Sequence, residues 1–559
     1  MTYQDRITLD GAAKAAMART RSRLSHAILA FGLVFTILFG RLVEVSMLRE
    51  NVGPRSARTE NDVTYYRADI VDRKGEILAT DLQGASLYAD ARVIWDPAET
   101  AKEIKGVVPS VDVAALTKKL GTRQAFVWIK RNLSPGQQEG VRQLGLPGLY
   151  FKSEPRRVYP NGRTASHALG YVDVDNHGLA GVERGIEDLV LERRNKGGLV
   201  ELSLDLRVQH VLEDELSGAV ASFHARAGAG VVLDVNNGEI LALSSMPDFD
   251  PNEPAASSKN ELFNRVTQGV YEMGSTFKIF TAATALDASK ITLASQFDAT
   301  VPITVGQYTI SDFHPENRFL TVPEIFMFSS NIGSAKMALE IGTPTQRAYF
   351  GKLGLLSPLS LEIKESGAPL IPKRWGELET MTTSYGHGVA VTPLHIAVAS
   401  AAIVNGGKFI RPTLVKRDPK AVVPFTRVVS ETTSSQMRDL MRMVVTQGTG
   451  GKADVPGYPV GGKTGTAEKV SGQTYAEKSL LTSFVGVFPA KAPLYVVLIV
   501  LDEPQPSEAT QGFATAGWTA APTAGKVIAR IAPMLNVPVA PIEPSKGAPT
   551  TMASYEELH

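Results

Sequence analysis

Residues 24–40 form an apolar run, LSHAILAFGLVFTILFG, with no charged side chain apart from a protonatable His26. At about 1.5 Å per residue the run spans roughly 25 Å, just enough for a bilayer core with help from its flanks. Four positive side chains precede it: Lys14, Arg19, Arg21 and Arg23. We therefore expect a membrane anchor over 24–45, a cytoplasmic tail over 1–23, and the rest of the chain beyond the membrane.

Two other structures could explain this run. It could be a buried core helix, or the apolar part of a cleaved signal peptide. The sequence after it, residues 41–47, lacks the small-x-small pattern that signal peptidase cleaves. An uncleaved signal-anchor is therefore the preferred interpretation.

The bulk composition argues against several classes of protein. Hydrophobic residues make up 43% of the 559 residues and charged residues 21%, as is typical of globular domains. The net charge of +1 lacks the basic excess of a general nucleic-acid binder. There is no cysteine, and the nine histidines form no cluster with ligand spacing, so we expect no metal site and no cofactor.

Beyond the anchor the chain divides into two folded regions. Residues 49–200 contain a hairpin pattern over 69–79 and a polar, helical segment over 97–145, but no nucleophile paired with a base. Residues 201–536 follow the order helix, two strands, helical block, three strands, helix. That order predicts an α+β domain whose central antiparallel sheet is assembled from both ends of the region and flanked by helices. Residues 537–559 are expected to form a disordered tail.

The stretch EMGSTFK at 272–278 contains a serine and, three residues later, a lysine. Residues i and i+3 of a helix lie on one face, so Ser275 and Lys278 are expected to touch. A serine hydroxyl becomes a nucleophile once a base accepts its proton, and a lysine can do so when burial lowers its pKa. Alone the pattern is weak, because Ser-x-x-Lys occurs by chance; the alternative is a solvent-facing helix start.

Two short motifs follow downstream. Ser329 and Asn331 bracket one residue, so in a loop their hydroxyl and amide could point into one cleft. The alternative for this motif is the N-cap of the next helix. In the extended stretch KTGT at 463–466, the lysine and glycine face one way and the two threonines face the other. A glycine in a strand often marks the close approach of another backbone or a ligand.

In this order, Ser-x-x-Lys, Ser-x-Asn and Lys-Thr-Gly resemble the motifs of the penicillin-recognising serine acyltransferases, which include penicillin-binding proteins and serine β-lactamases. Each motif also falls on the element that this family uses, namely a helix start, a loop between helices and an edge strand. The resemblance implies that residues 201–536 form a penicillin-binding transpeptidase domain.

Other stretches narrow the resemblance. Three are similar to the N-terminal pedestal, or dimerisation-type, domain of class B penicillin-binding proteins, which is expected over 49–200: residues 67–78, 157–162 and 181–183. Ala68 stands where that family more often has glycine. Two resemble division-specific transpeptidases of the penicillin-binding protein 3 type: SYGHG at 384–388 and DEP at 502–504. Residues 49–200 leave little room for the glycosyltransferase domain of class A enzymes.

The resemblance implies a mechanism for the first half of the reaction. Ser275 would attack the carbonyl of the penultimate D-alanine of a stem pentapeptide and release the terminal D-alanine. Lys278 would accept the proton of Ser275, and Ser329 would relay a proton to the leaving amine. Asn331 would order Lys278 and the substrate amide. Lys463 would be a nearby cation, and each lysine would lower the pKa of the other.

The same resemblance assigns the binding groups. The backbone amides of Ser275 and Thr466 would form the oxyanion hole, with Gly465 between the two threonines. The hydroxyls of Thr464 and Thr466 would hold the terminal carboxylate of the substrate. The amine of a neighbouring stem would then attack the ester and form a cross-link. A β-lactam would acylate Ser275 because its amide mimics the D-Ala-D-Ala bond.

The implied role is cross-linking of the septal cell wall during division. The implied location is the bacterial inner membrane, with the catalytic domain in the periplasm. The implied partners are stem pentapeptides, β-lactams, the membrane, a polytopic lipid-linked glycan polymerase and other divisome proteins, but no nucleic acid. Three alternatives are an elongation-specific transpeptidase, a β-lactam-hydrolysing enzyme, and a membrane-anchored sensor or division scaffold. The 384–388 and 502–504 stretches favour division, and no motif supplies the glutamate that class A β-lactamases use for deacylation.

Overall fold

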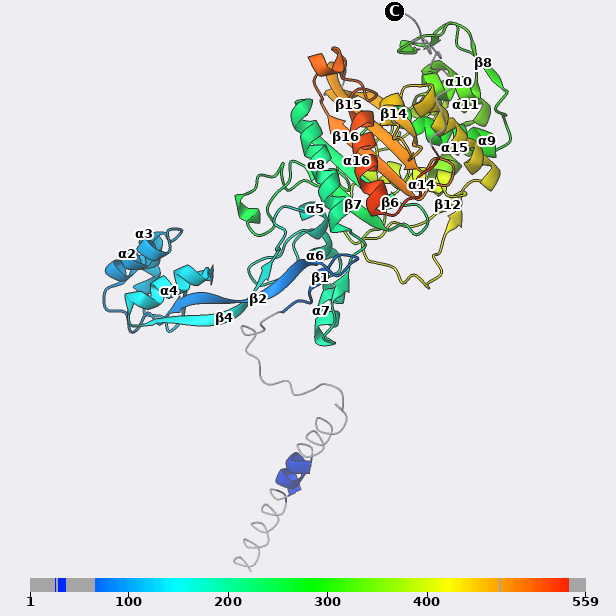
Figure 1. The fold of residues 1–559 in the computed structure, drawn as a ribbon. Coiled ribbons are helices and arrows are strands. Elements are labelled where there is room, and N and C mark those ends of the chain that lie inside the picture. The colour runs from blue at the N-terminus through cyan, green and yellow to red at the C-terminus, as the bar shows by residue number, and fades with distance from the viewer. Residues whose placement is uncertain (1–25, 27–28, 37–65, 472–473, 542–559) are drawn as a thin grey trace, which may run out of the picture. The chain divides into compact units, whose positions relative to one another are not determined.

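The computed structural model describes four ranges: residues 26, 29–36, 66–471 and 474–541. The chain forms two compact units, 1–64 and 65–559, and each is described by itself. Figure 1 shows the arrangement of elements in the second unit.

The predicted membrane anchor over 24–45 is described only at His26 and over 29–36, where the chain is helical. Within the described ranges no helix is both long enough and apolar enough to cross a membrane. The remainder of the anchor, the predicted tail over 1–23 and the end of the chain from 542 onward lie outside the described residues. The expectation of disorder over 537–559 is wrong for its first residues, because Val537 is buried in a hydrophobic core and Ala540 N donates to the Gly457 carbonyl oxygen.

A five-stranded sheet forms the first part of the second unit. The hairpin of β1 (Ile70–Val71) and β2 (Ile77–Ala89) confirms the predicted turn, with Gly75 at φ +93°. The long strand β2 pairs with β3 and with β4, and β1 pairs in parallel with β5. The bounds of these partners are β3 (Val127–Leu133), β4 (Leu149–Val158) and β5 (Val200–Glu201).

The strand β3 corrects the expectation of a helical segment over 97–145. Helices α2 (Pro97–Val107), α3 (Val113–Leu120) and α4 (Pro135–Leu144) are present, but β3 separates the last two. Its ends, Val127 and Leu133, are buried in a core that these helices form against β2. Strand pairing with β2 therefore overrides the local polar character of the segment.

The base of this region contains the short helices α5 (Ser166–Leu169), α6 (Gly181–Gly185) and α7 (Glu187–Asn195). A buried ion cluster lies beside them. Glu183 on α6 binds Arg67 Nε at 2.9 Å and Arg157 Nε at 2.7 Å, and all three side chains are inaccessible to solvent. Asp81 on β2 supplies a second carboxylate to Arg157.

The second part is built on an antiparallel sheet in the order β14-β15-β16-β6-β7. Its strands are β6 (Ala227–Asp234), β7 (Ile240–Met246), β14 (Gly461–Ser471), β15 (Thr474–Phe488) and β16 (Tyr495–Asp502). The prediction of one antiparallel sheet assembled from both ends of the region is confirmed. The turn between β6 and β7 contains Gly238 at φ +75°, as the Asn-Asn-Gly sequence predicts.

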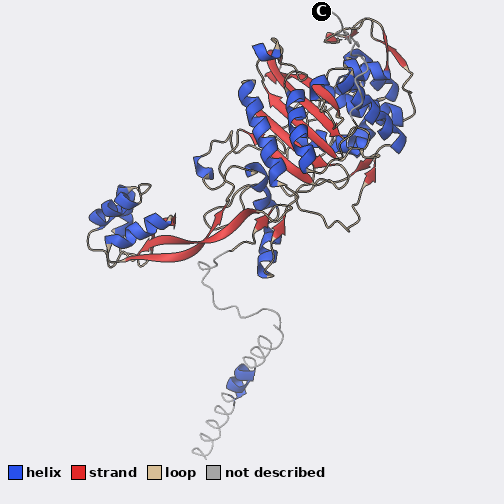
Figure 2. Ribbon diagram, in the orientation of Figure 1, coloured by secondary structure: helices blue, strands red, loops and turns tan. Residues whose placement is uncertain are grey.

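Helices cover both faces of this sheet, as Figures 1 and 2 show. On one face, α8 (Leu206–Ser222) and α16 (Ala520–Met534) bury their apolar sides in one core with alternate residues of the strands. On the other face lie α9 (Lys278–Asp287), α14 (Pro393–Val404) and α15 (Glu431–Thr446). The core on that face also contains buried residues from the first part of this unit, near β1 and the short helices α5 to α7, such as Ala68 and Tyr159. We call this part the base of the pedestal.

The remaining elements complete the helical side. The helices are α10 (Val322–Phe328), α11 (Asn331–Ile341), α12 (Thr343–Lys352) and α13 (Glu377–Thr383). Short strands pair as β8 (Gln296–Asp298) with β11 (Phe319–Thr321), β9 (Ile303–Val305) with β10 (Tyr308–Ile310), and β12 (Lys408–Phe409) with β13 (Thr426–Arg427).

Candidate active site

Ser275 lies in a 3₁₀ turn, Gly274–Phe277, that leads directly into α9. Gly274 adopts φ +56°, a conformation that only glycine takes readily, and a Cβ there would lie 3.0 Å from the Thr466 carbonyl oxygen. The neighbours of Ser275 in the turn are buried, whereas Ser275 itself is half-buried and lines a cleft. Ser275 therefore lies at a helix start, the element that the family resemblance implies for this motif.

Lys278 is the first residue of α9 and is 1% exposed. Its Nζ lies 3.0 Å from Ser275 Oγ, 2.7 Å from Asn331 Oδ1 and 3.1 Å from Ser329 Oγ. The Ser329 carbonyl oxygen accepts a further hydrogen bond from it. The alternative of a solvent-facing lysine is wrong, and the predicted contacts of Lys278 with both downstream residues are present.

The two lysines of the site are both fully buried and have depressed pKa values. Burial lowers the pKa of Lys278 well below its usual value, and the charge of Lys463 lowers it further. Burial alone lowers the pKa of Lys463 to about 7. The expected lowering of each lysine's pKa by the charge of the other is thus found for Lys278 only. Because both ammonium groups donate to Ser329 Oγ, at 3.1 and 2.9 Å, we expect Coulomb repulsion to act on both.

Ser329 and Asn331 lie at the junction of α10 and α11, as the resemblance implies. Ser329 adopts the left-handed conformation with φ +61°, which is uncommon for a residue with a Cβ. Such strain is typical of functional sites. The helix N-cap predicted as the alternative is also present, because Ser330 Oγ accepts from Gly333 N. Capping by the middle residue leaves the outer two side chains free to face Lys278.

The KTGT stretch lies on β14, the edge strand, and its side chains alternate as predicted. Lys463 points toward Ser329, while Thr464 and Thr466 line the cleft. A Cβ at Gly465 would lie 2.7 Å from the Met273 carbonyl oxygen. Glycine therefore lets the strand approach the turn that carries the serine.

Asp312 is a site residue that the sequence did not reveal. Its carboxylate accepts from the backbone amides of Asn331 at 2.5 Å and Ile332 at 3.0 Å, and from Ser330 Oγ at 2.7 Å. A carboxylate at this place also complements the positive end of α11. Its negative charge opposes the lowering of the pKa of Lys278. No fixed spacing links Asp312 to the three motifs, so only the fold could identify it.

The SYGHG stretch at 384–388 packs against the serine turn. Ser384 accepts a hydrogen bond from Thr281 Oγ through its carbonyl oxygen, and Gly388 N donates to Glu272. A Cβ at Gly386 would lie 2.2 Å from the Gly274 carbonyl oxygen. Burial and the charge of Lys278 lower the pKa of His387 to about 4, so its ring is neutral.

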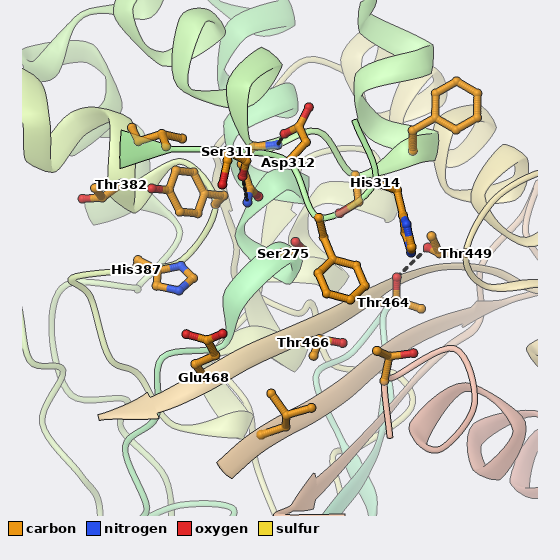
Figure 3. Close-up of a pocket in the computed structure, with 18 of the residues that line it drawn as sticks. Ser275, Ser311, Asp312, His314, Thr382, His387, Thr449, Thr464, Thr466 and Glu468 are labelled. Atoms are coloured by element: carbon orange, nitrogen blue, oxygen red, sulfur yellow. Dashed lines mark hydrogen bonds between the residues drawn. The ribbon is translucent and has the colours of Figure 1, made fainter. Parts of the chain in front are cut away.

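These elements surround a cleft of about 1200 Å³ (Figure 3). Ser275 lies at its centre, between β14 below and the loop of Ser311 and Asp312 above. Thr449 and Thr464, whose hydroxyls are 2.6 Å apart, lie at one side. A serine hydroxyl, a buried amine and a row of threonine hydroxyl groups thus face one space that can hold an extended peptide.

Two family models match this chain. Residues 228–525 match the penicillin binding protein transpeptidase domain, and residues 63–188 match the penicillin-binding protein dimerisation domain. This chain belongs to the class B penicillin-binding proteins. The family resemblance drawn from its motifs is confirmed.

Individual relatives agree with this class B assignment. The chain is 44% identical over 483 residues to a probable peptidoglycan D,D-transpeptidase FtsI of Caulobacter vibrioides, covering 84% of this chain and 82% of that relative. The transpeptidase domain of Burkholderia pseudomallei penicillin-binding protein 3 is 33% identical with a TM-score of 0.55, covering 60% of this chain and 97% of that one. Penicillin binding protein 3 of Mycobacterium tuberculosis, solved in complex with aztreonam, is 23% identical with a TM-score of 0.67, covering 86% and 98%.

Proposed function

We propose that this protein is a septal peptidoglycan D,D-transpeptidase that cross-links stem peptides through an acyl-enzyme on Ser275 and is a target of β-lactams. One observation carries the residue assignment. Lys278 Nζ lies 3.0 Å from Ser275 Oγ, in a buried site where all three motifs meet. The family and its FtsI relatives support the reaction and the role in division.

Acylation begins when neutral Lys278 accepts the proton of Ser275. Ser275 Oγ then bonds to the carbonyl carbon of the penultimate D-alanine, and the C–N bond to the terminal D-alanine breaks. Ser329 Oγ, which contacts both Lys278 and Lys463, passes a proton to the leaving amine. The terminal D-alanine departs as a free amino acid and leaves an ester on Ser275.

Cross-linking reverses these proton transfers. The side-chain amine of a second stem attacks the ester carbonyl, and Ser275 leaves with the proton that returns from Lys278. The backbone amides of Ser275 and Thr466 stabilise the oxyanion in both steps. The hydroxyls of Thr464 and Thr466 hold the terminal carboxylate of the donor.

The proposed location is the bacterial inner membrane at the septum, with one anchor over 24–45 and a periplasmic catalytic domain. The apolar run and the positive residues before it support this placement. A polytopic lipid-linked glycan polymerase and other divisome proteins are the proposed partners. Fusion of a phosphatase that is active only in the periplasm after residue 60 should give activity; an inactive fusion would contradict the orientation.

Labelling with a fluorescent penicillin tests the reaction centre. Ser275→Ala should abolish covalent labelling because it removes the acylated oxygen. Ser217→Ala, an exposed serine on α8, should be labelled like the unmodified chain. Labelling of Ser275→Ala that persists at the control level would exclude Ser275 as the nucleophile.

A further inference from the structure

Glu468 is a carboxylate of the cleft that the proposed mechanism does not use. It lies on β14, two residues beyond Thr466 and four beyond Thr464, and all three line the cleft. Since alternate residues of a strand share one face, the three side chains form a row. Figure 3 shows Thr464 and Glu468 on opposite sides of Ser275 along this strand.

The other charged groups that line the cleft have partners. Asp312 binds the start of α11, and Glu379 accepts from Gly376 N at 2.9 Å. The ammonium of Lys452 lies 3.9 Å from the ring centroid of Trp518. Glu468, in contrast, is exposed and has no hydrogen bond or ion pair within the described residues.

The neighbouring cation on β14 cannot serve Glu468. Lys469 faces the opposite side of the strand and pairs with Asp502 at 2.8 Å and Glu503 at 2.6 Å. The pairing with β15 shifts register directly after Glu468. Such an irregularity in strand pairing can re-aim the side chains beside it. The strand therefore presents to the cleft a carboxylate that has no partner among the residues whose side chains are described.

We propose that Glu468 is a specificity-determining residue that binds the side-chain ammonium of the third residue of the donor stem peptide. This inference rests on the proposed function. The donor's terminal carboxylate lies at Thr464 and Thr466, and its scissile carbonyl lies at Ser275, so the rest of the stem extends along β14 toward Glu468.

The dimensions of the strand agree with this placement. Thr464 and Glu468 are four residues apart, or about 13 Å along a strand. The donor's third residue is two residues from its carboxyl end, or roughly 7 Å in extended form. The remaining distance is within the reach of the flexible side chain of a diamino acid such as lysine. A cation is thus brought to the one carboxylate of the cleft that lacks a partner among the described residues.

Two donor peptides that differ only in the charge of one side chain measure the contact between Glu468 and the ammonium directly. Two synthetic pentapeptides ending in D-Ala-D-Ala are compared, one with a free side-chain amine at the third residue and one with that amine acetylated. The readout is the ratio of kcat/KM for D-alanine release, free amine over acetylated, in each full-length variant. We expect the ratio of the unmodified chain to exceed one by about two- to fivefold, as for a partly exposed ion pair. Added salt should reduce it.

The Glu468→Gln variant should bring this ratio close to one, and Glu468→Lys should bring it below one. Glu340→Gln removes an exposed carboxylate at the far end of α11 and should keep the ratio of the unmodified chain. A ratio that is the same in Glu468→Gln and in the unmodified chain would overturn the proposal. Absence of D-alanine release from every form, despite penicillin labelling, would instead contradict the proposed function.

A second probe uses the opposite charge. A β-lactam whose acyl side chain carries a carboxylate should acylate Glu468→Gln about two- to fivefold faster than the unmodified chain, relative to a neutral penicillin. Removal of like-charge repulsion is the physical reason. An unchanged relative rate would show that Glu468 does not face the acyl side chain, which would contradict the proposed course of the stem.

Discussion

Two buried amines converge on one hydroxyl in this site. Lys278 and Lys463 both contact Ser329 Oγ, and neither has a carboxylate within ion-pair distance among the described residues. Two like charges at such a place are costly, so at least one amine is expected to be neutral near pH 7. A neutral lysine beside Ser275 is what the proton transfer requires.

The pH dependence of acylation follows from these amines. Protonation removes the base, so the rate of penicillin acylation should rise with pH and level off above the pKa of the lysine pair. Since burial lowers the pKa of both lysines, that of Lys463 to about 7, we expect an apparent midpoint of the pair well below the usual range of lysine. Stopped-flow labelling from about pH 5 to about pH 9 measures it. A midpoint near that of free lysine would contradict a buried lysine base.

Asp312 should act through position and charge together. Asp312→Asn removes a charged acceptor from the start of α11, and a hydrogen bond to a charged group contributes about 1.5–3 kcal/mol. Acylation should therefore slow by about tenfold or more. The lost negative charge should also shift the acid limb of the pH profile to lower pH, because Asp312 raises the pKa of Lys278.

Asp439→Asn changes an exposed carboxylate on α15 and is the matched control. It should alter neither the rate nor the acid limb. Slower acylation of Asp312→Asn with an unmoved acid limb would mean that its charge does not reach Lys278. Helical spacing predicts Ser275 and Lys278 as neighbours, and the family resemblance of its motif implies Lys463 beside them, whereas Asp312 belongs to none of the three motifs and acts through a loop contact.

At the scale of elements, the serine turn is fixed by close backbone packing. Gly386→Ala would place a Cβ 2.2 Å from the Gly274 carbonyl oxygen, so the SYGHG loop or the serine turn must move. We expect acylation by penicillin to fall more than about tenfold, since displacing a positioned group by 1 Å can cost about 100-fold.

Gly406→Ala is the control for backbone strain alone. Gly406 has φ +87°, close to the +85° of Gly386, but nothing lies within 4 Å of its Cβ position. It should lose about 1–2 kcal/mol of stability from the left-handed conformation and keep its labelling rate. Equal loss of labelling in both variants would show that strain, not the contact with Gly274, is responsible.

The elements themselves were predictable where their pattern was long and periodic. Buried Val208, Val211, Leu212 and Leu216 recur at helical spacing and produce α8 as expected. The strand β3, VWIKRNL, was missed because its apolar and polar residues come in two blocks and do not alternate, and its five central residues are only half-buried. Its conformation depends on pairing with β2, about forty residues earlier, which local patterns do not encode.

At the scale of the molecule, the base of the pedestal shares a hydrophobic core with the catalytic sheet, whereas the pedestal helices α2 to α4 have a core of their own. Glu183→Gln removes the carboxylate that Arg67 and Arg157 share, so each arginine loses one charged hydrogen bond and keeps a single carboxylate partner, Glu187 or Asp81. Since a hydrogen bond to a charged group contributes about 1.5–3 kcal/mol, the substitution should cost about 3 kcal/mol or more. Because the core is shared, the loss should lower the temperature at which penicillin labelling disappears on heating.

Ile104→Ala creates a cavity in the separate core and should cost about 2–5 kcal/mol there. It should destabilise only the helical part of the pedestal and leave the thermal loss of labelling unchanged. If both variants lowered the labelling temperature equally, the two cores would unfold as one unit. If neither did, the ion cluster would not support the catalytic sheet.

The proposed reaction transfers the acyl group to Ser275. Mass spectrometry of the proteolysed, penicillin-acylated protein tests it most directly. We expect the added mass on the peptide that contains Ser275 and, after fragmentation, on that residue alone. Acylation of a peptide that lacks Ser275 would contradict the claim.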